Sequence, residues 1–262
     1  MSSAVEHDCL NCRHRTLRVF CNLHADALAE FNGMGTLRRL DSGTELFSES
    51  TPVREVFVLC QGKVKLTTTS RQGKGLVLKI ARPGDVLGLG AAVSGSLHEV
   101  TALATEPLQV KSIPRADLLA FLDRNAEGGV HATRIVSAEY ESAFFGARRL
   151  ALSSSSAARL ASLLLEWAQA SVEVERETAV LKIIKLDTEK QDVVQRSAQP
   201  AQLSAAPRFL MPLTHEEIAG MIGSTRETVT RTLNRFKRDQ IIAIKGASIH
   251  LLAPEKLQEL VA

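Results

Sequence analysis

The sequence lacks any apolar run long enough to span a membrane. No stretch of about 18 apolar residues occurs in the chain, so we expect no membrane partner. Residues 1–8 have neither a basic start nor a long apolar stretch, so they do not resemble a secretion signal. We therefore expect a cytoplasmic protein, and its 262 residues are enough for two domains.

The sequence motifs of common enzyme classes are also missing. There is no glycine loop ending in Lys-Ser or Lys-Thr, no metal-hydrolase helix, and no Ser, His and Asp ordering with local support. The glycines between residues 84 and 95 fit turns between strands better than a dinucleotide-binding loop. We therefore do not expect an enzyme.

A large excess of charge of one sign is missing as well, because the formal net charge is only +3. Positive charge is instead concentrated between residues 226 and 238. Glu227 is the one acidic residue there, and it accompanies five basic ones: Arg226, Arg231, Arg235, Lys237 and Arg238. Such a stripe suits a phosphate backbone, and a solvated helix face is the alternative.

Short alternating segments between residues 36 and 113 predict β-structure. Apolar residues alternate with their neighbours over 64–68, 76–80, 100–104 and 108–111, and Gly or Pro separates these segments. Many short strands with turn residues between them predict a sandwich or barrel.

Helical spacing follows Pro114. We expect a long helix over 127–150 and another over 155–170. The long helix carries an apolar seam that either packs on the β-domain or forms a two-fold dimer contact: Val136, Tyr140, Ala143, Phe144, Ala147 and Leu150. Gln, Ser, Ala and Pro dominate residues 187–208, which predicts a flexible loop after a short strand over 181–186.

Two capping-box patterns indicate a pair of short helices over 214–236. Residues 214–217 and 224–227 both have the form Ser/Thr-x-x-Glu, which predicts helix starts at Thr214 and Ser224, with Gly223 in the turn. The inner faces are expected to be apolar: Ile218, Ala219 and Ile222, then Val229, Leu233 and Phe236. This arrangement predicts a helix-turn-helix, and a hairpin over 241–252 makes it winged.

The start of the second helix is expected to enter the DNA major groove. Its exposed side chains, here named the recognition face, are Arg226, Glu227, Thr230 and Arg231. Arg can pair with guanine O6 and N7, and Glu can accept from cytosine N4. Alternatively, Glu227 is only the reciprocal cap of Ser224. The later basic residues of the helix are expected to contact phosphate or water.

The stretch 213–233, and above all the Arg-Glu-Thr-Val-Thr-Arg run at 226–231, resembles the signature of the CRP/FNR family of bacterial regulators. The resemblance implies an α+β fold with a cyclic-nucleotide-binding-type β-roll (jelly roll), a long dimerisation helix and a C-terminal winged helix-turn-helix. It also implies a homodimer on a palindromic operator in double-stranded DNA, with RNA polymerase as a partner. Arg226, Glu227 and Arg231 match base-contacting residues of the family.

On this basis we predict four parts of the chain. A Cys-rich segment occupies 1–24, a β-roll sensor domain 25–125, the dimerisation helix 126–152, and the DNA-binding domain with its loop 153–262. The FNR branch usually lacks an arginine at the place of Arg226, so this residue resembles the CRP branch and suggests a TGTGA-like half-site.

Cyclic AMP in the family's usual binding mode is not expected. Leu89 stands where the family has a ribose-binding Glu, and Glu99 stands where it has a phosphate-binding Arg. No Lys or Arg occurs between Pro83 and Val110. A buried phosphate that faces a carboxylate with no cation beside it is unfavourable.

The four cysteines of the chain, here named the cysteine group, are Cys9, Cys12, Cys21 and Cys60. The first three resemble the N-terminal cluster ligands of FNR-type oxygen sensors, although the spacing before Cys21 is longer. The family's fourth position is Lys111 here, so Cys60 is the only candidate fourth ligand. The resemblance implies a [4Fe–4S] cluster that senses oxygen, redox state or nitric oxide.

Other interpretations of these cysteines remain open. Zinc could be held by the first three with His14 or His24. The thiols could form a metal-free redox switch, or Cys60 could be plain core in a regulator of a small ligand. Covalently attached haem is poorly supported, because Cys-x-x-Cys-His is absent: Arg13 stands between Cys12 and His14.

Overall fold

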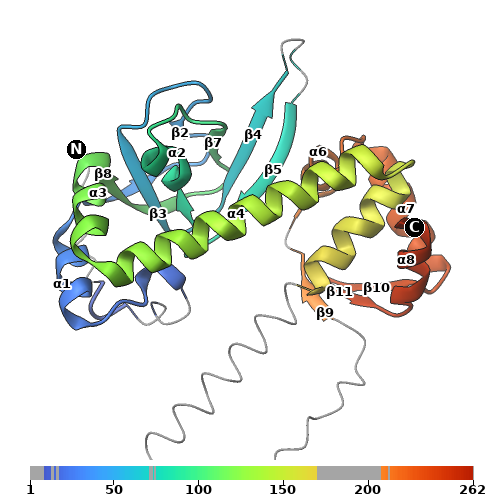
Figure 1. The fold of residues 1–262 in the computed structure, drawn as a ribbon. Helices are drawn as coiled ribbons and strands as arrows, with labels where there is room; N and C mark the ends of the chain where they lie inside the picture. The colour runs from blue at the N-terminus through green and yellow to red at the C-terminus, as the bar shows by residue number, and fades with distance from the viewer. Residues whose placement is uncertain are drawn as a thin grey trace, which may run out of the picture. The chain divides into compact units, whose positions relative to one another are not determined.

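A computed structural model describes residues 9–12, 15, 18–70, 73, 75–169, 208–211 and 213–261. His14, the predicted strand over 181–186 and residues 187–207 of the predicted loop lie outside the described residues. The chain divides into two compact units, Met1–Gly146 and Ala147–Ala262, and each is described by itself (Figure 1).

The first unit contains two four-stranded antiparallel sheets, which form the predicted β-roll (Figure 1). One sheet has the strand order β1-β8-β3-β6, with bounds Thr36–Leu40, Leu108–Pro114, Glu55–Gln61 and Val86–Leu87. The other has the order β2-β7-β4-β5, with bounds Glu45–Phe47, Thr101–Ala104, Val64–Thr69 and Gly75–Ala81. The sequence prediction of short strands separated by turns is thereby confirmed.

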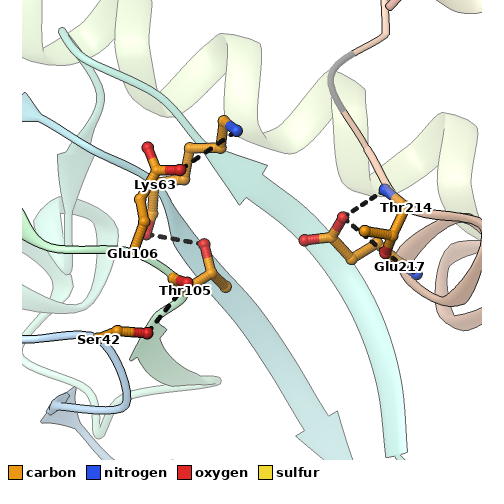
Figure 2. A network of polar contacts seen from close by, with 6 residues as sticks. All are labelled: Ser42, Lys63, Thr105, Glu106, Thr214 and Glu217. Atoms are coloured by element: carbon orange, nitrogen blue, oxygen red, sulfur yellow. Dashed lines mark hydrogen bonds and ion pairs between the residues drawn. The ribbon is translucent and has the colours of Figure 1, made fainter.

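Two side-chain hydrogen bonds join neighbouring turns at one edge of the roll, and a glycine provides the backbone conformation that one of these turns needs. The Ser42 hydroxyl donates to the Thr105 carbonyl at 3.1 Å, and the Thr105 hydroxyl donates to the Lys63 carbonyl at 3.2 Å (Figure 2). Gly62 has a φ of 92°, and a Cβ there would lie 2.6 Å from the Leu108 Cβ. Only glycine fits this turn without displacing the next strand.

Short helices surround the roll in the first unit. They are the 3-10 turn η2 (Val19–Cys21), α1 (Ala25–Gly33), α2 (Leu89–Ser94) and α3 (Arg115–Arg124). Phe20 of η2 contacts Phe31 of α1 with ring centroids 5.5 Å apart, and Phe31 in turn lies 6.1 Å from Phe121 of α3. All three rings are buried, so the residues around Cys21 pack into the core.

Helix α4 spans Ala126–Leu152, slightly longer than the predicted 127–150 (Figure 1). Its apolar seam has two environments. Val136 packs on the buried core of the roll, whereas Tyr140 is 71% exposed and Phe144 is 52% exposed. The Tyr140 and Phe144 rings stack on each other with centroids 6.4 Å apart. Part of the seam therefore belongs to the core of the first unit, and part of it faces solvent in a single chain.

The second unit has the predicted helix-turn-helix and wing. Residues 156–169 are helical, close to the predicted 155–170. The wing consists of β10 (Ile242–Lys245) and β11 (Ser248–Leu251), and helix α8 (Pro254–Val261) follows. The unpredicted strand β9 (Arg208–Leu210) pairs with β11. No helix in the described part of the chain is long and apolar enough to cross a membrane.

Candidate nucleic-acid interface and cysteine group

The first helix of the helix-turn-helix begins with a complete capping box. The Glu217 backbone N–H of α6 (His215–Met221) donates to the Thr214 hydroxyl at 3.2 Å, and the Thr214 N–H donates to the Glu217 carboxylate at 2.6 Å (Figure 2). The predicted start at Thr214 is confirmed. Gly223 has a φ of 60°, which provides the turn after this helix.

The N-cap of the second helix, α7 (Arg226–Arg238), lies one residue after the predicted N-cap. Thr225, not Ser224, is the N-cap, and its hydroxyl accepts from the Thr228 N–H at 3.3 Å. The Ser224 hydroxyl instead donates to the Ser156 hydroxyl at 3.2 Å. The predicted cap at Ser224, and with it the reciprocal cap between Glu227 and Ser224, is therefore wrong. Ser224 and Thr225 both carry a hydroxyl that could cap the helix, but the Ser224 hydroxyl is bonded to Ser156 instead.

The two faces of α7 differ sharply in burial. Val229, Leu233 and Phe236 are buried, as predicted. The opposite face borders one hollowed surface, lined by Arg226, Glu227, Thr230, Arg231, Thr232, Asn234, Arg235 and Arg238. The structure thus brings together all four residues of the recognition face. Five of the lining residues carry charge, four of them positive, which suits contact with a polyanion.

Glu227 is an ionised carboxylate on this surface. Its own backbone N–H and then the Thr225 hydroxyl hydrogen-bond to the carboxylate, and Arg226 adds attraction, so the pKa of Glu227 is lowered. Because the side chain is exposed, its second oxygen is accessible from solvent. A carboxylate so placed can accept a hydrogen bond from a cytosine amino group.

Thr230 differs from the other residues of the recognition face, because its hydroxyl already has two partners. Thr230 Oγ1 lies 2.9 Å from the Arg226 carbonyl and 2.8 Å from Nδ1 of His215. A carbonyl can only accept, so the single hydroxyl proton goes to Arg226, and His215 must donate from Nδ1. The Thr230 hydroxyl therefore has no proton left to donate to another group.

The cysteine group is assembled in the first unit from two separate parts of the chain. None of the four cysteines forms a disulfide, and Cys21 is buried. The other three thiols all raise the pKa of Cys21 by charge repulsion, so the four sulfur atoms lie within electrostatic range of one another. The Cys9 N–H donates to the Asn32 side chain at 2.8 Å, which attaches the first cysteine to α1.

Cys60 lies next to Lys111, the position at which the family resemblance would place the fourth cysteine. Strand β3 pairs with β8 through Val58↔Lys111 and Leu59↔Val110, and the register then shifts so that Cys60 has no opposite residue. The backbone N–H of Lys111 hydrogen-bonds to the Cys60 sulfur. The Lys111 ammonium is directed elsewhere and donates to the Asn32 carbonyl at 3.0 Å.

Burial keeps two of the thiols protonated. Burial, reinforced by repulsion from Cys60, raises the pKa of Cys21 to about 12. Burial, with repulsion from Cys9, raises the pKa of Cys60 to about 11. Arg18 lowers both pKa values by attraction, and its guanidinium donates to the Cys60 carbonyl at 2.9 Å. Sequence reasoning missed Arg18, because nothing along the chain relates it to Cys60.

The described residues contain no group of three or more His, Cys, Asp and Glu side chains arranged closely enough to hold a metal ion. The donor set of the cysteine group nonetheless fits an iron–sulfur cluster in kind. The four thiols form no disulfide and lie within electrostatic range of one another, and four cysteine thiolates are the usual ligands of such a cluster.

The part of the roll that would hold a cyclic nucleotide has a different lining. Leu89 is fully buried, whereas Glu99 is exposed. His98 stacks on Phe47 with ring centroids 3.8 Å apart, and its Cε1 lies 3.0 Å from where a Cβ of Gly88 would be. Burial lowers the pKa of His98, so the ring is favoured in its neutral form and offers no fixed positive charge to a phosphate.

Comparisons with known proteins agree with this architecture. Residues 37–125 match the family model of the cyclic nucleotide-binding domain, and residues 158–260 match that of the Crp-like helix-turn-helix domain. The nitrogen fixation regulation protein FixK of Bradyrhizobium diazoefficiens is 25% identical, over 98% of this chain and 94% of its own. The transcriptional activator protein Anr of Pseudomonas protegens is 26% identical, over 96% and 92%.

Solved structures show the same fold. FixK2 from Bradyrhizobium japonicum superposes with a TM-score of 0.63 at 21% identity, covering 87% of this chain and 97% of that one. A CooA mutant from Carboxydothermus hydrogenoformans gives a TM-score of 0.67 at 17% identity, covering 99% and 98%. With its β-roll, its winged helix-turn-helix and relatives that match nearly its whole length, the chain belongs to the CRP/FNR family of DNA-binding transcription regulators.

Proposed function

We propose that this regulator binds a palindromic operator as a homodimer and receives its signal through a [4Fe–4S] cluster held by Cys9, Cys12, Cys21 and Cys60. The observation that carries the proposal is the convergence of four thiols, none of them in a disulfide, from the N-terminal segment and β3. The position of Cys60 beside Lys111 supports it, since the missing fourth ligand of β8 is replaced from the neighbouring strand.

The protonation of the buried thiols favours a cluster over a metal-free thiol switch. A thiol reacts as its thiolate, and the raised pKa values of Cys21 and Cys60 keep both protonated near neutral pH. Iron binds the thiolate form and releases the thiol proton, so the metal–sulfur bond would offset the cost of ionising a buried thiol. A bound cluster would supply reactivity toward oxygen or nitric oxide.

The chain's own residues connect the cysteine group to α4. His24 follows Cys21 by three residues, and its Nδ1 lies 2.6 Å from the Glu127 carboxylate in the first turn of α4. The His24 backbone N–H donates to the same carboxylate at 2.9 Å. A cluster bound by the cysteine group would order the N-terminal segment. Through the contact between His24 and Glu127, this would stabilise the start of α4, whose exposed seam we assign to the dimer contact.

Anaerobic purification, followed by iron and sulfide assays and an absorbance spectrum, tests the cofactor. We expect iron and sulfide in the native protein and their loss in Cys60→Ala. Gln109→Ala, a partly exposed residue of the paired strand β8 outside the cysteine group, is the matched control and should keep the cluster. Colourless, iron-free protein after anaerobic reconstitution would overturn the cluster proposal, and stoichiometric zinc in its place would favour the zinc alternative.

The interaction with DNA is tested separately, with a selection of binding sites from random duplexes. A palindromic consensus with TGTGA-like half-sites is expected, because Arg226 is available to pair with a guanine. A homodimer spans two half-sites about one helical turn apart. Recovery of a single, non-repeated site would contradict the proposed homodimer. RNA polymerase is the further partner that we propose at such operators, in the cytoplasm, where the DNA lies.

A further inference from the structure

A second candidate site lies in the first unit, separate from both the recognition face and the cyclic-nucleotide region. A hollow of about 360 Å³ opens between the N-terminal segment, the turn from β5 to β6, and α4. It is lined by Arg18, Val19, Lys79, Arg82, Pro83, Gly84, Asp85, Arg134, Ile135, Ala138 and Glu139. This volume is at the small end of the range for ligand pockets, about 300–1,000 Å³. We call it the anion hollow.

Four cationic side chains and two carboxyl groups line the anion hollow. Not every cation among them forms an ion pair with a carboxylate. Lys79 forms an ion pair with Asp85 at 3.0 Å, and the same carboxylate accepts from the Arg82 backbone N–H at 2.7 Å. Asp85 is thereby engaged. Among the residues that the structure describes, the Arg18 guanidinium hydrogen-bonds only to a neutral carbonyl, that of Cys60.

The remaining two guanidinium groups are exposed and available. Within the described residues, neither the Arg82 nor the Arg134 guanidinium forms a hydrogen bond or an ion pair. The one carboxyl left to balance them is Glu139, and burial raises its pKa, so its neutral form is favoured relative to an ordinary glutamate. The hollow therefore has more cationic than anionic side chains, and none of its three guanidinium groups forms an ion pair with a carboxylate in the described part of the chain.

From this juxtaposition of three guanidinium groups without a carboxylate partner, we infer that the anion hollow binds a small molecule carrying a phosphate group. Guanidinium groups recognise phosphate oxygens with paired, charge-assisted hydrogen bonds. Val19, Ile135 and Ala138 offer apolar surface for a short organic body attached to the phosphate. Gly84 is essential to the shape of the hollow, because a Cβ there would lie 2.9 Å from the Arg18 Cγ.

The position of the hollow gives such a ligand a defined effect. Arg18 and Val19 come from the segment between Cys12 and Cys21, whereas Arg134 and Glu139 belong to α4. A phosphate held by both would tie the N-terminal segment to the helix at a second point, about two turns beyond the His24–Glu127 pair. None of the side chains that line the hollow belongs to the cysteine group or to the recognition face.

The test is a calorimetric titration of the full-length protein with inorganic phosphate, both as purified anaerobically and in iron-free form, with chloride used to keep ionic strength constant. Saturable binding is expected. The Arg82→Gln/Arg134→Gln variant should bind at least about tenfold more weakly, because two charge-assisted interactions are lost. Arg39→Gln, an exposed arginine on β1 outside the hollow, should bind phosphate like the native protein.

Equal affinity in the native protein and the double variant would overturn the inference, and so would the absence of saturable binding. Both replaced side chains are exposed, and circular dichroism melting checks that the variants fold. Each single variant, Arg82→Gln and Arg134→Gln, should bind with intermediate affinity. Unchanged affinity in both singles would also count against the site.

Discussion

At the scale of single residues, function depends on which side-chain atoms remain available. Arg226 and Arg231 are exposed on the recognition face, whereas the Thr230 hydroxyl is held between His215 and the Arg226 carbonyl. Sequence reasoning grouped these residues together because it could place them on one helix face but could not see that α6 supplies a partner for one of them.

Thr230→Val provides a first test of this distinction. The change keeps the methyl group and the shape but removes the hydroxyl, so base preference in a binding-site selection should be unchanged, although the His215 contact is lost. Arg231→Ala should weaken specific binding by about 1–3 kcal/mol, as expected for one good base contact. A changed base preference in Thr230→Val would show that the hydroxyl contacts DNA.

The buried His98 ring predicts a loss of stability at acidic pH. Burial lowers its pKa in the folded state, so its contribution to stability is complete above the unfolded value of about 6.5 and is lost as pH falls below it. The thermal midpoint of the iron-free protein should fall more steeply below that pH in the native chain than in His98→Gln. Parallel pH profiles for the two proteins would refute this assignment.

At the scale of elements, capping determines where the two DNA-binding helices begin. The periodicity of apolar residues predicted both helices, because side-chain spacing on a helix is a local property. It did not distinguish Ser224 from Thr225 as the cap of α7, since both precede the helix and both carry a hydroxyl. The contact between Ser224 and Ser156 decides between them, and it joins residues 68 positions apart.

Thr225→Ala should therefore destabilise the protein by about 1 kcal/mol, the usual cost of losing an N-cap. Ser224→Ala should cost less, because its hydroxyl does not cap the helix. Denaturant unfolding of the two variants, followed by circular dichroism, gives the comparison. A larger loss in Ser224→Ala than in Thr225→Ala would restore the cap assignment made from the sequence.

At the scale of the whole molecule, the order of β-roll, long helix and winged helix-turn-helix was predictable from periodicity, turn residues and family resemblance. Strand β9 and the position of Cys60 beside Lys111 could not be predicted in this way. Strand β9 has three residues, and only its pairing with β11 defines it. The proximity of Cys60 to Lys111 depends on the register of β3 against β8, which are far apart in the sequence. Long-range pairing of this kind leaves no periodic pattern along the chain.

Assembly of the molecule is tested at the exposed part of the seam. Phe144→Glu places a charge beside Tyr140, and in a helix-to-helix dimer this charge would be buried against its own copy. Sedimentation should show a shift from dimer to monomer, together with a loss of operator binding. Ser137→Glu is the matched control, because Ser137 is exposed on the same helix but lies outside the predicted seam, and this variant should remain dimeric. A Phe144→Glu protein that stays dimeric would remove the seam from the dimer contact.

The irregular register at Cys60 has a consequence for how related sequences are compared. Position 111 has lost the family's cysteine, so a column-by-column comparison would classify this chain as lacking a four-ligand site. The extra residue in β3 offers a thiol to the same region from the adjacent strand. If the proposed cluster is found, this chain would be a case in which a ligand comes from the neighbouring strand, and a census of sensors that counts cysteines in fixed alignment columns would overlook it.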